Sequence, residues 1–142
     1  MISQSAEYSL RALICLARSR GTPLTTQQIA QHAKIPSGYL AKILQALARA
    51  GLVSGQRGLN GGFLLTAEPG AVTLLEVVRL TDASRRIETC PMGIHGNHLC
   101  PLHRRLDDAA AAVESALART TLAELLVEEP DPFAPDIKQA AN

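Results

Sequence analysis

The sequence predicts a mainly α-helical fold, a winged helix-turn-helix followed by a long C-terminal helix. Aromatic residues make up 3% of the chain and Trp is absent, so the core must be built from aliphatic residues, which favours helices packed on helices. Two helical patterns joined by a short turn lie in the N-terminal third, and a Gly-rich hairpin pattern follows them. At 142 residues, the chain has room for one packed domain with an appendage.

The first predicted helix runs from about Ser3 to Arg18. Apolar residues recur on one side at helical spacing, namely Ala6, Leu10, Leu13 and Ala17. Polar residues occupy the other side, namely Gln4, Glu7, Arg11 and Arg18. Gly21 and Pro23 end this helix, which is therefore expected to be amphipathic.

The next two helices have the spacing of a helix-turn-helix. Thr25 and Gln28 form a capping-box pattern for a helix to about Ala33. After a short break, Pro36 and Ser37 are predicted as an N-cap pair for a third helix, which Gly51 ends as the residue beyond its C-cap. The predicted apolar stripe of the third helix consists of Leu40, Ile43, Leu44 and Leu47.

A β-hairpin wing is predicted over residues 52–65. Two short apolar strands flank a Gly-rich tip that holds Arg57, Gly58, Asn60 and Gly61. An Asn-Gly turn is expected to have positive φ at both positions. Small residues and one guanidinium would let this tip approach a phosphate backbone or enter a minor groove.

The C-terminal half carries three further helical patterns. Thr73 with Glu76 begins a helix to about Leu80, and Thr121 with Glu124 begins another to about Val127. Between them, residues 81–101 lack periodicity, which predicts a functional or disordered loop. The helix from Leu102 to about Arg119 presents an apolar stripe that needs a partner helix, namely Leu106, Ala109, Ala110, Val113, Ala116 and Leu117. Residues 128–142 are predicted to form a disordered tail.

The two halves of the chain differ in charge. Residues 1–66 contain seven Lys and Arg against one acidic residue, whereas residues 67–142 contain seven against twelve. The basic half is the candidate surface for a polyanion. The sequence shows neither a charged leader before an apolar run nor a membrane span, so a cytoplasmic protein without membrane contact is expected.

Residues 90–103 concentrate metal-binding side chains. Cys90, His95, His98, Cys100 and His103 supply five candidate ligands within fourteen residues, and the odd total of three Cys argues against a disulfide framework. Zinc and an iron-sulfur cluster both suit such ligands, and a metal-free thiol switch is a third reading. Cys15 lies among apolar residues and is expected to be a core residue.

An enzyme is not expected. A zinc enzyme could use this loop with Glu88 as base, but the sequence offers neither a second acid-base cluster nor a His-Glu-x-x-His helix.

Three segments carry a resemblance to a known family. They are the run from Glu7 to Leu13, the run from Ile35 to Leu44, and Gly51-Leu52-Val53 followed by Arg57-Gly58-Leu59-Asn60-Gly61-Gly62-Phe63. From about Met1 to Val127, the chain resembles the Rrf2 family of bacterial transcription regulators. The resemblance implies a homodimeric, sequence-specific transcription regulator whose long C-terminal helices cross. Two wings and two recognition helices should then read a pseudo-palindromic operator in double-stranded DNA.

The resemblance also implies a sensor of redox state, nitric oxide or iron-sulfur status in the loop. Iron-sulfur members typically have three Cys there, whereas this chain has Cys90 and Cys100 alone, so the three-thiolate site is excluded. The resemblance implies a mixed site for a [2Fe-2S] cluster, formed by Cys90, Cys100, His103 and Glu7 of the other subunit. A surface salt bridge between Glu7 and Arg11 is an equally good explanation of Glu7.

The DNA-contacting residues are predicted at two places. On the third helix they are Ser37, Gly38, Tyr39, Lys42 and Gln45, with Tyr39 the one that could instead pack against the domain. In the wing they are Arg57, Gly58, Asn60 and Gly61. The chain is thus predicted to divide into a DNA-binding domain (1–80), a sensor loop (81–101), a dimerisation helix with a short terminal helix (102–127) and a tail (128–142).

Overall fold

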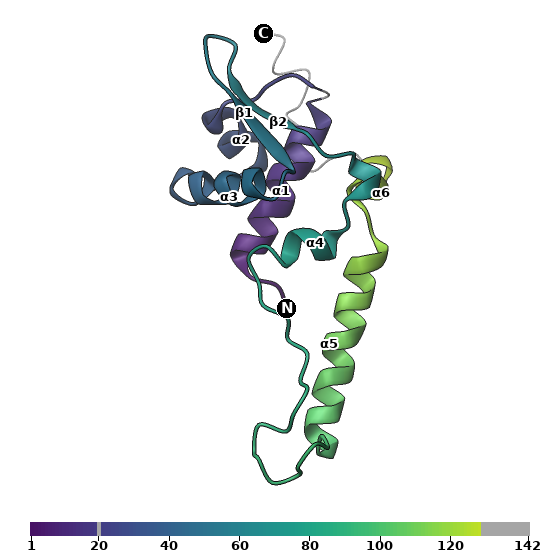
Figure 1. Ribbon diagram of the computed structural model, residues 1–142. Coiled ribbons are helices and arrows are strands. Elements are labelled where there is room, and N and C mark those ends of the chain that lie inside the picture. The colour runs from purple at the N-terminus through teal and green to yellow at the C-terminus, as the bar shows by residue number, and fades with distance from the viewer. Residues whose placement is uncertain (20, 129–142) are drawn as a thin grey trace.

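A computed structural model describes residues 1–19 and 21–128 (Figure 1). The elements in chain order are α1 (Gln4–Arg18), α2 (Thr26–Ala33), α3 (Ser37–Arg49), β1 (Val53–Gln56), β2 (Gly62–Leu65), the short 3₁₀ helix η1 (Pro69–Ala71), α4 (Leu74–Val78), α5 (Pro101–Arg119) and α6 (Leu122–Val127). This order confirms the mainly α-helical winged helix-turn-helix. Residues 129–142 of the predicted tail lie outside the described residues.

The predicted capping signals are present. Ser3, which was expected to begin the first helix, is instead the N-cap of α1 and accepts a hydrogen bond from the Ala6 amide. Complete capping boxes begin α2, α4 and α6 as predicted. Each box satisfies two helix-end amides that would otherwise lack partners. The helix starts were predictable because these contacts are local in sequence.

The turn between α2 and α3 corrects one prediction. Lys34 adopts the left-handed conformation, with φ 56°, and ends α2. Pro36, not Ser37, is the N-cap of α3, and no side chain caps this helix. Ser37 is the first helical residue because Pro36 has the extended ψ of 132° that an N-cap requires. Gly51, with φ 76°, lies just beyond the C-cap Ala50 as predicted.

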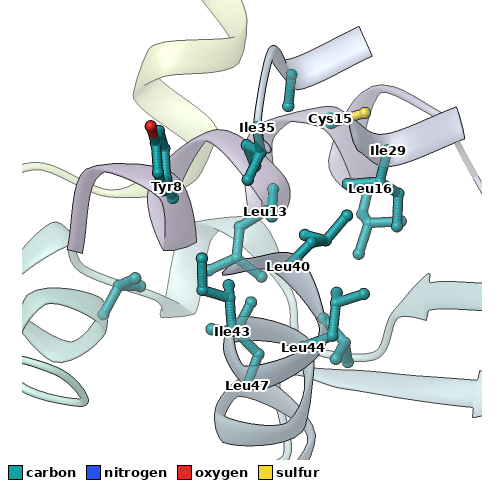
Figure 2. Close-up of a cluster of buried hydrophobic side chains, with 14 of the residues drawn as sticks. Tyr8, Leu13, Cys15, Leu16, Ile29, Ile35, Leu40, Ile43, Leu44 and Leu47 are labelled. Atoms are coloured by element: carbon teal, nitrogen blue, oxygen red, sulfur yellow. The ribbon is translucent and has the colours of Figure 1, made fainter. Parts of the chain in front are cut away.

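The core joins α1, α2 and α3 (Figure 2). Val77 of α4 and Leu122 of α6 pack into the same cluster. Its fully buried side chains include Leu13, Leu16, Ile29, Leu40, Leu44, Leu47, Val77 and Leu122. Cys15 is buried in this cluster, which agrees with its predicted structural role.

The wing is an antiparallel pair, with Val53 opposite Leu65 and Gln56 opposite Gly62. Its base is fixed to the domain because the Leu24 and Phe63 backbones exchange two hydrogen bonds. The expected Asn-Gly turn is wrong: positive φ occurs at Gly58 and Gly62, not at Asn60 or Gly61. The tip is closed instead by the Gly61 amide, which donates to the Gly58 carbonyl at 2.9 Å.

Two helix boundaries differ from the predicted ones. α4 ends at Val78 rather than near Leu80, because the Leu80 and Thr81 amides bond three residues back in a tightened last turn. α5 begins at Pro101, one residue early, since proline suits the first helical position.

The far end of α5 is joined to the rest of the fold. The Leu74 amide donates to Thr120 and the Leu122 amide donates to Val72, so α6 folds back onto the core. The remainder of α5 extends away from the wing, beside the long α4–α5 loop (Figure 1). None of its 19 residues is buried in the chain. Among the described residues, no helix is long and apolar enough to cross a membrane.

Candidate functional site

The outer face of α3 presents the predicted contact residues. Ser37, Gly38, Tyr39, Lys42 and Gln45 are all exposed, while the apolar stripe of the same helix is buried. No side chain caps α3, although the Tyr39 amide donates to the Pro36 carbonyl, and the helix dipole favours negative charge at this end. This face can therefore bind phosphate groups and base edges together.

Tyr39 lies between the two roles foreseen for it. Its ring meets that of Tyr8 edge to face, with centroids 5.8 Å apart, yet 51% of the residue remains exposed. Arg11 packs on the other ring at 5.4 Å and donates to the Lys34 carbonyl in the helix-turn-helix turn. Tyr39 thus ties α3 to α1 while keeping part of its side chain open to a ligand.

The wing tip exposes Arg57, Gly58 and Asn60, and Gly61 is half-buried. Leu59, which the sequence reasoning did not single out, projects fully into solvent at the same tip. The sequence signal that could have identified Leu59 is that it is an apolar residue outside any periodic pattern.

A second surface that sequence reasoning missed lies beside the start of α3. An open hollow is lined there by Thr26, Gln27, Ala30, Gln31, Ile35 and Ser37. The sequence signal that could have identified this surface is the polar side of α2, since the first helix of a helix-turn-helix crosses the nucleic-acid backbone.

Cys90, Cys100 and His103 come together at the N-terminus of α5. One ligand atom from each lies within 4.8 Å of the others, and His103 Nδ1 is 2.9 Å from Cys100 Sγ and 3.7 Å from Cys90 Sγ. Cys100 is the N-cap of α5 and His103 is the third helical residue, so the first turn places both on one side. Two sulfur donors and one imidazole form a group able to hold a metal centre.

Cys90 is favoured as a thiolate. Its pKa is lowered from the ordinary 9.0 to about 6, chiefly by a hydrogen bond from the Met92 backbone, with His95 and Cys100 adding to it against the opposing effect of burial. A thiolate is the form of Cys that binds metals and reacts with oxidants.

Carboxylates of α5 hold the segment that leads to Cys90. Arg86 forms a two-point pair with Asp107, at 2.7 and 2.8 Å, and Asp107 also accepts from the Ile87 amide. These hydrogen bonds from Arg86 and Ile87 lower the pKa of Asp107 to about 2. Further along α5, Glu114 accepts a hydrogen bond from the Ser84 hydroxyl and forms an ion pair with Arg79. Hydrogen bonds and ion pairs therefore join the α4–α5 loop to α5.

Glu7 is not part of the three-donor group in one chain. It pairs with Arg11 at 2.5 Å within α1, which is the salt bridge that the sequence reasoning weighed against a ligand role. His98 and Glu88 are exposed.

Comparison with known proteins accounts for this arrangement. The family model of Rrf2, described as "Iron-dependent Transcriptional regulator", matches residues 2–128. The chain belongs to the Rrf2 family. The basic N-terminal half and the winged helix-turn-helix are thereby explained, because Rrf2-type transcription regulators bind DNA.

Individual Rrf2 relatives support the assignment along the whole chain. The transcriptional regulator NsrR of Shouchella clausii is 30% identical, over 92% of this chain and 91% of its own length. The regulator IscR of Yersinia pestis is 28% identical, over 99% and 91%. The solved structure of CymR, the global cysteine regulator of B. subtilis, is 30% identical, has a TM-score of 0.76, and the match covers 92% of this chain and 98% of CymR.

Proposed function

We propose that this Rrf2-type regulator is a homodimer that binds pseudo-palindromic operators and responds to redox state, nitric oxide or iron-sulfur status. The observation that carries the proposal is the meeting of Cys90, Cys100 and His103 at the start of a helix with no buried residue. A ligand-binding loop joined to such a helix can change how two subunits pack. We infer that it acts in the cytoplasm, where a bacterial regulator meets DNA.

The proposed DNA interface consists of α3 and the wing. Ser37, Gly38, Tyr39, Lys42 and Gln45 would make base-edge and phosphate contacts from α3, and Arg57, Gly58, Asn60 and Gly61 would contact the backbone or minor groove. Their exposure and the uncapped start of α3 support this assignment. Residues 1–80 therefore form the DNA-binding domain of the proposal.

The proposed dimer interface is α5, within residues 102–127. Leu102 and Leu106 are 61% and 49% exposed in the single chain, and the rest of the apolar stripe is only half covered or open. A second copy of α5 would remove this apolar surface from water. Two copies would then present two α3 helices to two operator half-sites.

The proposed sensor is the loop of residues 81–101. Its donors fit an iron-sulfur cluster in kind, which we propose to be [2Fe-2S], with Cys90, Cys100 and His103 as ligands. The fourth ligand is a carboxylate or an imidazole, and the resemblance implies Glu7 of the partner subunit. When bound, the cluster supplies a group that oxidants and nitric oxide attack, and mixed ligation leaves it more labile than four thiolates would.

Loss or gain of the bound metal group would reach the DNA-binding domain through α5. Cys100 and His103 belong to its first turn, and Arg86 and Asp107 fix the preceding segment to the same helix. Loss of the bound group would release these residues and alter the packing of α5 against its partner. A changed angle between the two winged domains would alter operator affinity.

Anaerobic purification tests the proposal. The protein should be coloured, with visible absorption lost in Cys90→Ala and Cys100→Ala but retained in the matched variant Cys15→Ala, whose sulfur lies in the core. Colourless protein with stoichiometric zinc would favour a zinc site, which the compact donor group also suits. Colourless, metal-free protein whose operator binding responds to peroxide would leave the thiol switch.

A further inference from the structure

We propose that His95 is the fourth ligand of the metal site, so that one chain completes the site as Cys90, His95, Cys100 and His103. The inference rests on the proposed function of the loop as a metal-binding sensor. It assigns the open ligand position to an imidazole of the same loop instead of Glu7 of the partner subunit.

The distances around Cys90 carry the inference. His95 Nδ1 lies 3.5 Å from Cys90 Sγ, and His103 Nδ1 lies 3.7 Å from the same sulfur. With metal–sulfur bonds of about 2.3 Å and metal–nitrogen bonds of about 2.0 Å in a tetrahedral site, a sulfur and a nitrogen that share one metal are about 3.5 Å apart. His95 therefore stands at the distance from Cys90 that a shared metal would set, although it lies outside the compact group of Cys90, Cys100 and His103. Because each iron of a [2Fe-2S] centre takes two protein ligands, Cys90 would share an iron with only one of the two imidazoles, whereas a single zinc ion would bind both.

The backbone brings His95 back to Cys90. The Gly93 amide donates to the Cys90 carbonyl at 3.0 Å, and Gly93 and Gly96 have φ of 70° and 55°. A Cβ at either glycine would meet nothing within 4 Å, so glycine is required there by the left-handed conformation rather than by space. The two glycines flank the segment that carries His95 and reverse the chain toward the sulfur.

Glu7 already has a structural role. It pairs with Arg11 at 2.5 Å, and Arg11 also packs on Tyr8 and donates to the Lys34 carbonyl. Moving Glu7 to the loop of another subunit would break the first of these contacts. The imidazole of His95 needs no such exchange.

The ligand set has chemical consequences. Two thiolates and two imidazoles suit tetrahedral zinc, and they also occur in [2Fe-2S] centres, where replacement of two Cys by two His raises the reduction potential. The spacing Cys-x₄-His-x₄-Cys-x₂-His ends in the first turn of α5, so the site would form within each protomer. Metal binding would then be independent of dimerisation.

The test compares His95→Ala with Glu7→Gln in the full chain, purified anaerobically. Iron, sulfide and zinc per chain and visible absorption are measured, with His98→Ala as the matched control for the loss of a loop imidazole. We expect His95→Ala to lose bound metal to the level of Cys90→Ala, while Glu7→Gln and His98→Ala keep the parent content. His95→Cys should restore binding by supplying a thiolate at the same position.

The outcomes separate this inference from the proposed function. Full metal content in His95→Ala together with loss in Glu7→Gln would overturn the inference and leave the metal sensor intact. Zinc in the parent and its loss in His95→Ala would support the His95 ligand while overturning the iron-sulfur cluster. A parent with neither iron nor zinc would overturn both.

Discussion

Arg57 is the single Lys or Arg between Val53 and Leu65, and it sits at the exposed wing tip. We expect Arg57→Ala to weaken operator binding by about 1 to 3 kcal/mol, because a guanidinium that enters a groove makes contacts that water cannot replace. Fluorescence anisotropy with a labelled operator fragment measures the loss. Arg57→Lys keeps the charge but not the planar donor fork, so it should recover only part of the affinity.

The fold and subunit state should not change in Arg57→Ala, since this residue lies outside the core. Thermal melts and light scattering check this. Affinity equal to that of the parent would move the contact surface away from the wing.

Gly61 is a residue at which even a methyl group has no room. An added Cβ would lie 2.4 Å from the Gln56 carbonyl oxygen and 2.8 Å from that of Gly58, both of which are backbone atoms. We expect Gly61→Ala to displace the wing tip and weaken DNA binding. Gly70→Ala is the matched control, because its nearest contact is an ordinary 3.9 Å to the Ala123 side chain. Equal affinity of the two variants would show that the tip tolerates displacement.

At the scale of the element, the exposed apolar stripe of α5 predicts that two copies of the protein form a dimer. Leu106 lies on the exposed apolar stripe, whereas Ser115 is exposed on the other side of the helix. We expect Leu106→Glu to convert the dimer into a monomer, because it would bury an unpaired charge between two helices. Ser115→Glu should stay dimeric. Light scattering at micromolar concentration distinguishes them, and a monomeric parent would refute the proposed dimer.

The stability that the Asp107 contacts between the α4–α5 loop and α5 contribute should depend on pH. Since the pKa of Asp107 is lowered to about 2, chiefly by Arg86, its contribution to stability is fully present above the ordinary pKa of 3.8 and is lost as pH falls toward 2. We expect the difference in unfolding free energy between the parent and Asp107→Asn to be constant above about pH 5 and to shrink below pH 4. Urea titrations between pH 3 and 7 measure it, and a difference that persists unchanged at pH 3 would contradict the pairing.

For the molecule as a whole, DNA binding should depend steeply on salt. Each phosphate neutralised contributes a slope of about −0.9 to the plot of log affinity against log salt concentration. With Lys42 and Arg57 from each of two protomers, the slope should be on the order of −4. Lys42→Gln should make it shallower by about 0.9 per protomer. Affinity that does not change with salt would exclude the electrostatic interface.

The parts of the fold that were predictable from sequence are those that depend on contacts between residues close together in the chain. The Thr25, Thr73 and Thr121 capping boxes and the apolar stripe of α3 depend on residues three or four apart, so helix starts and the buried face follow from the sequence. Ser37 was misplaced because Pro36 and Ser37 both suit a helix start, and only the ψ of Pro36 decides between them.

The site was less predictable because its contacts are not periodic. Ligand types at 90–103 were visible in the sequence, and the turn of α5 that pairs Cys100 with His103 follows from their spacing. The approach of His95 to Cys90 depends on two left-handed glycines, and the hydrogen bonds of Asp107 and Glu114 join residues 20 or more positions apart. No local pattern encodes such pairs.

The contact between Tyr8 and Tyr39 makes the protein its own optical reporter. The chain has no Trp and two Tyr, and both rings meet where α1 touches the start of α3. Tyrosine emission therefore arises from this one junction, and half of Tyr39 is open to whatever docks on α3. Quenching or a change of anisotropy on adding unlabelled DNA would follow the docking event in real time, without a dye and without altering a single residue.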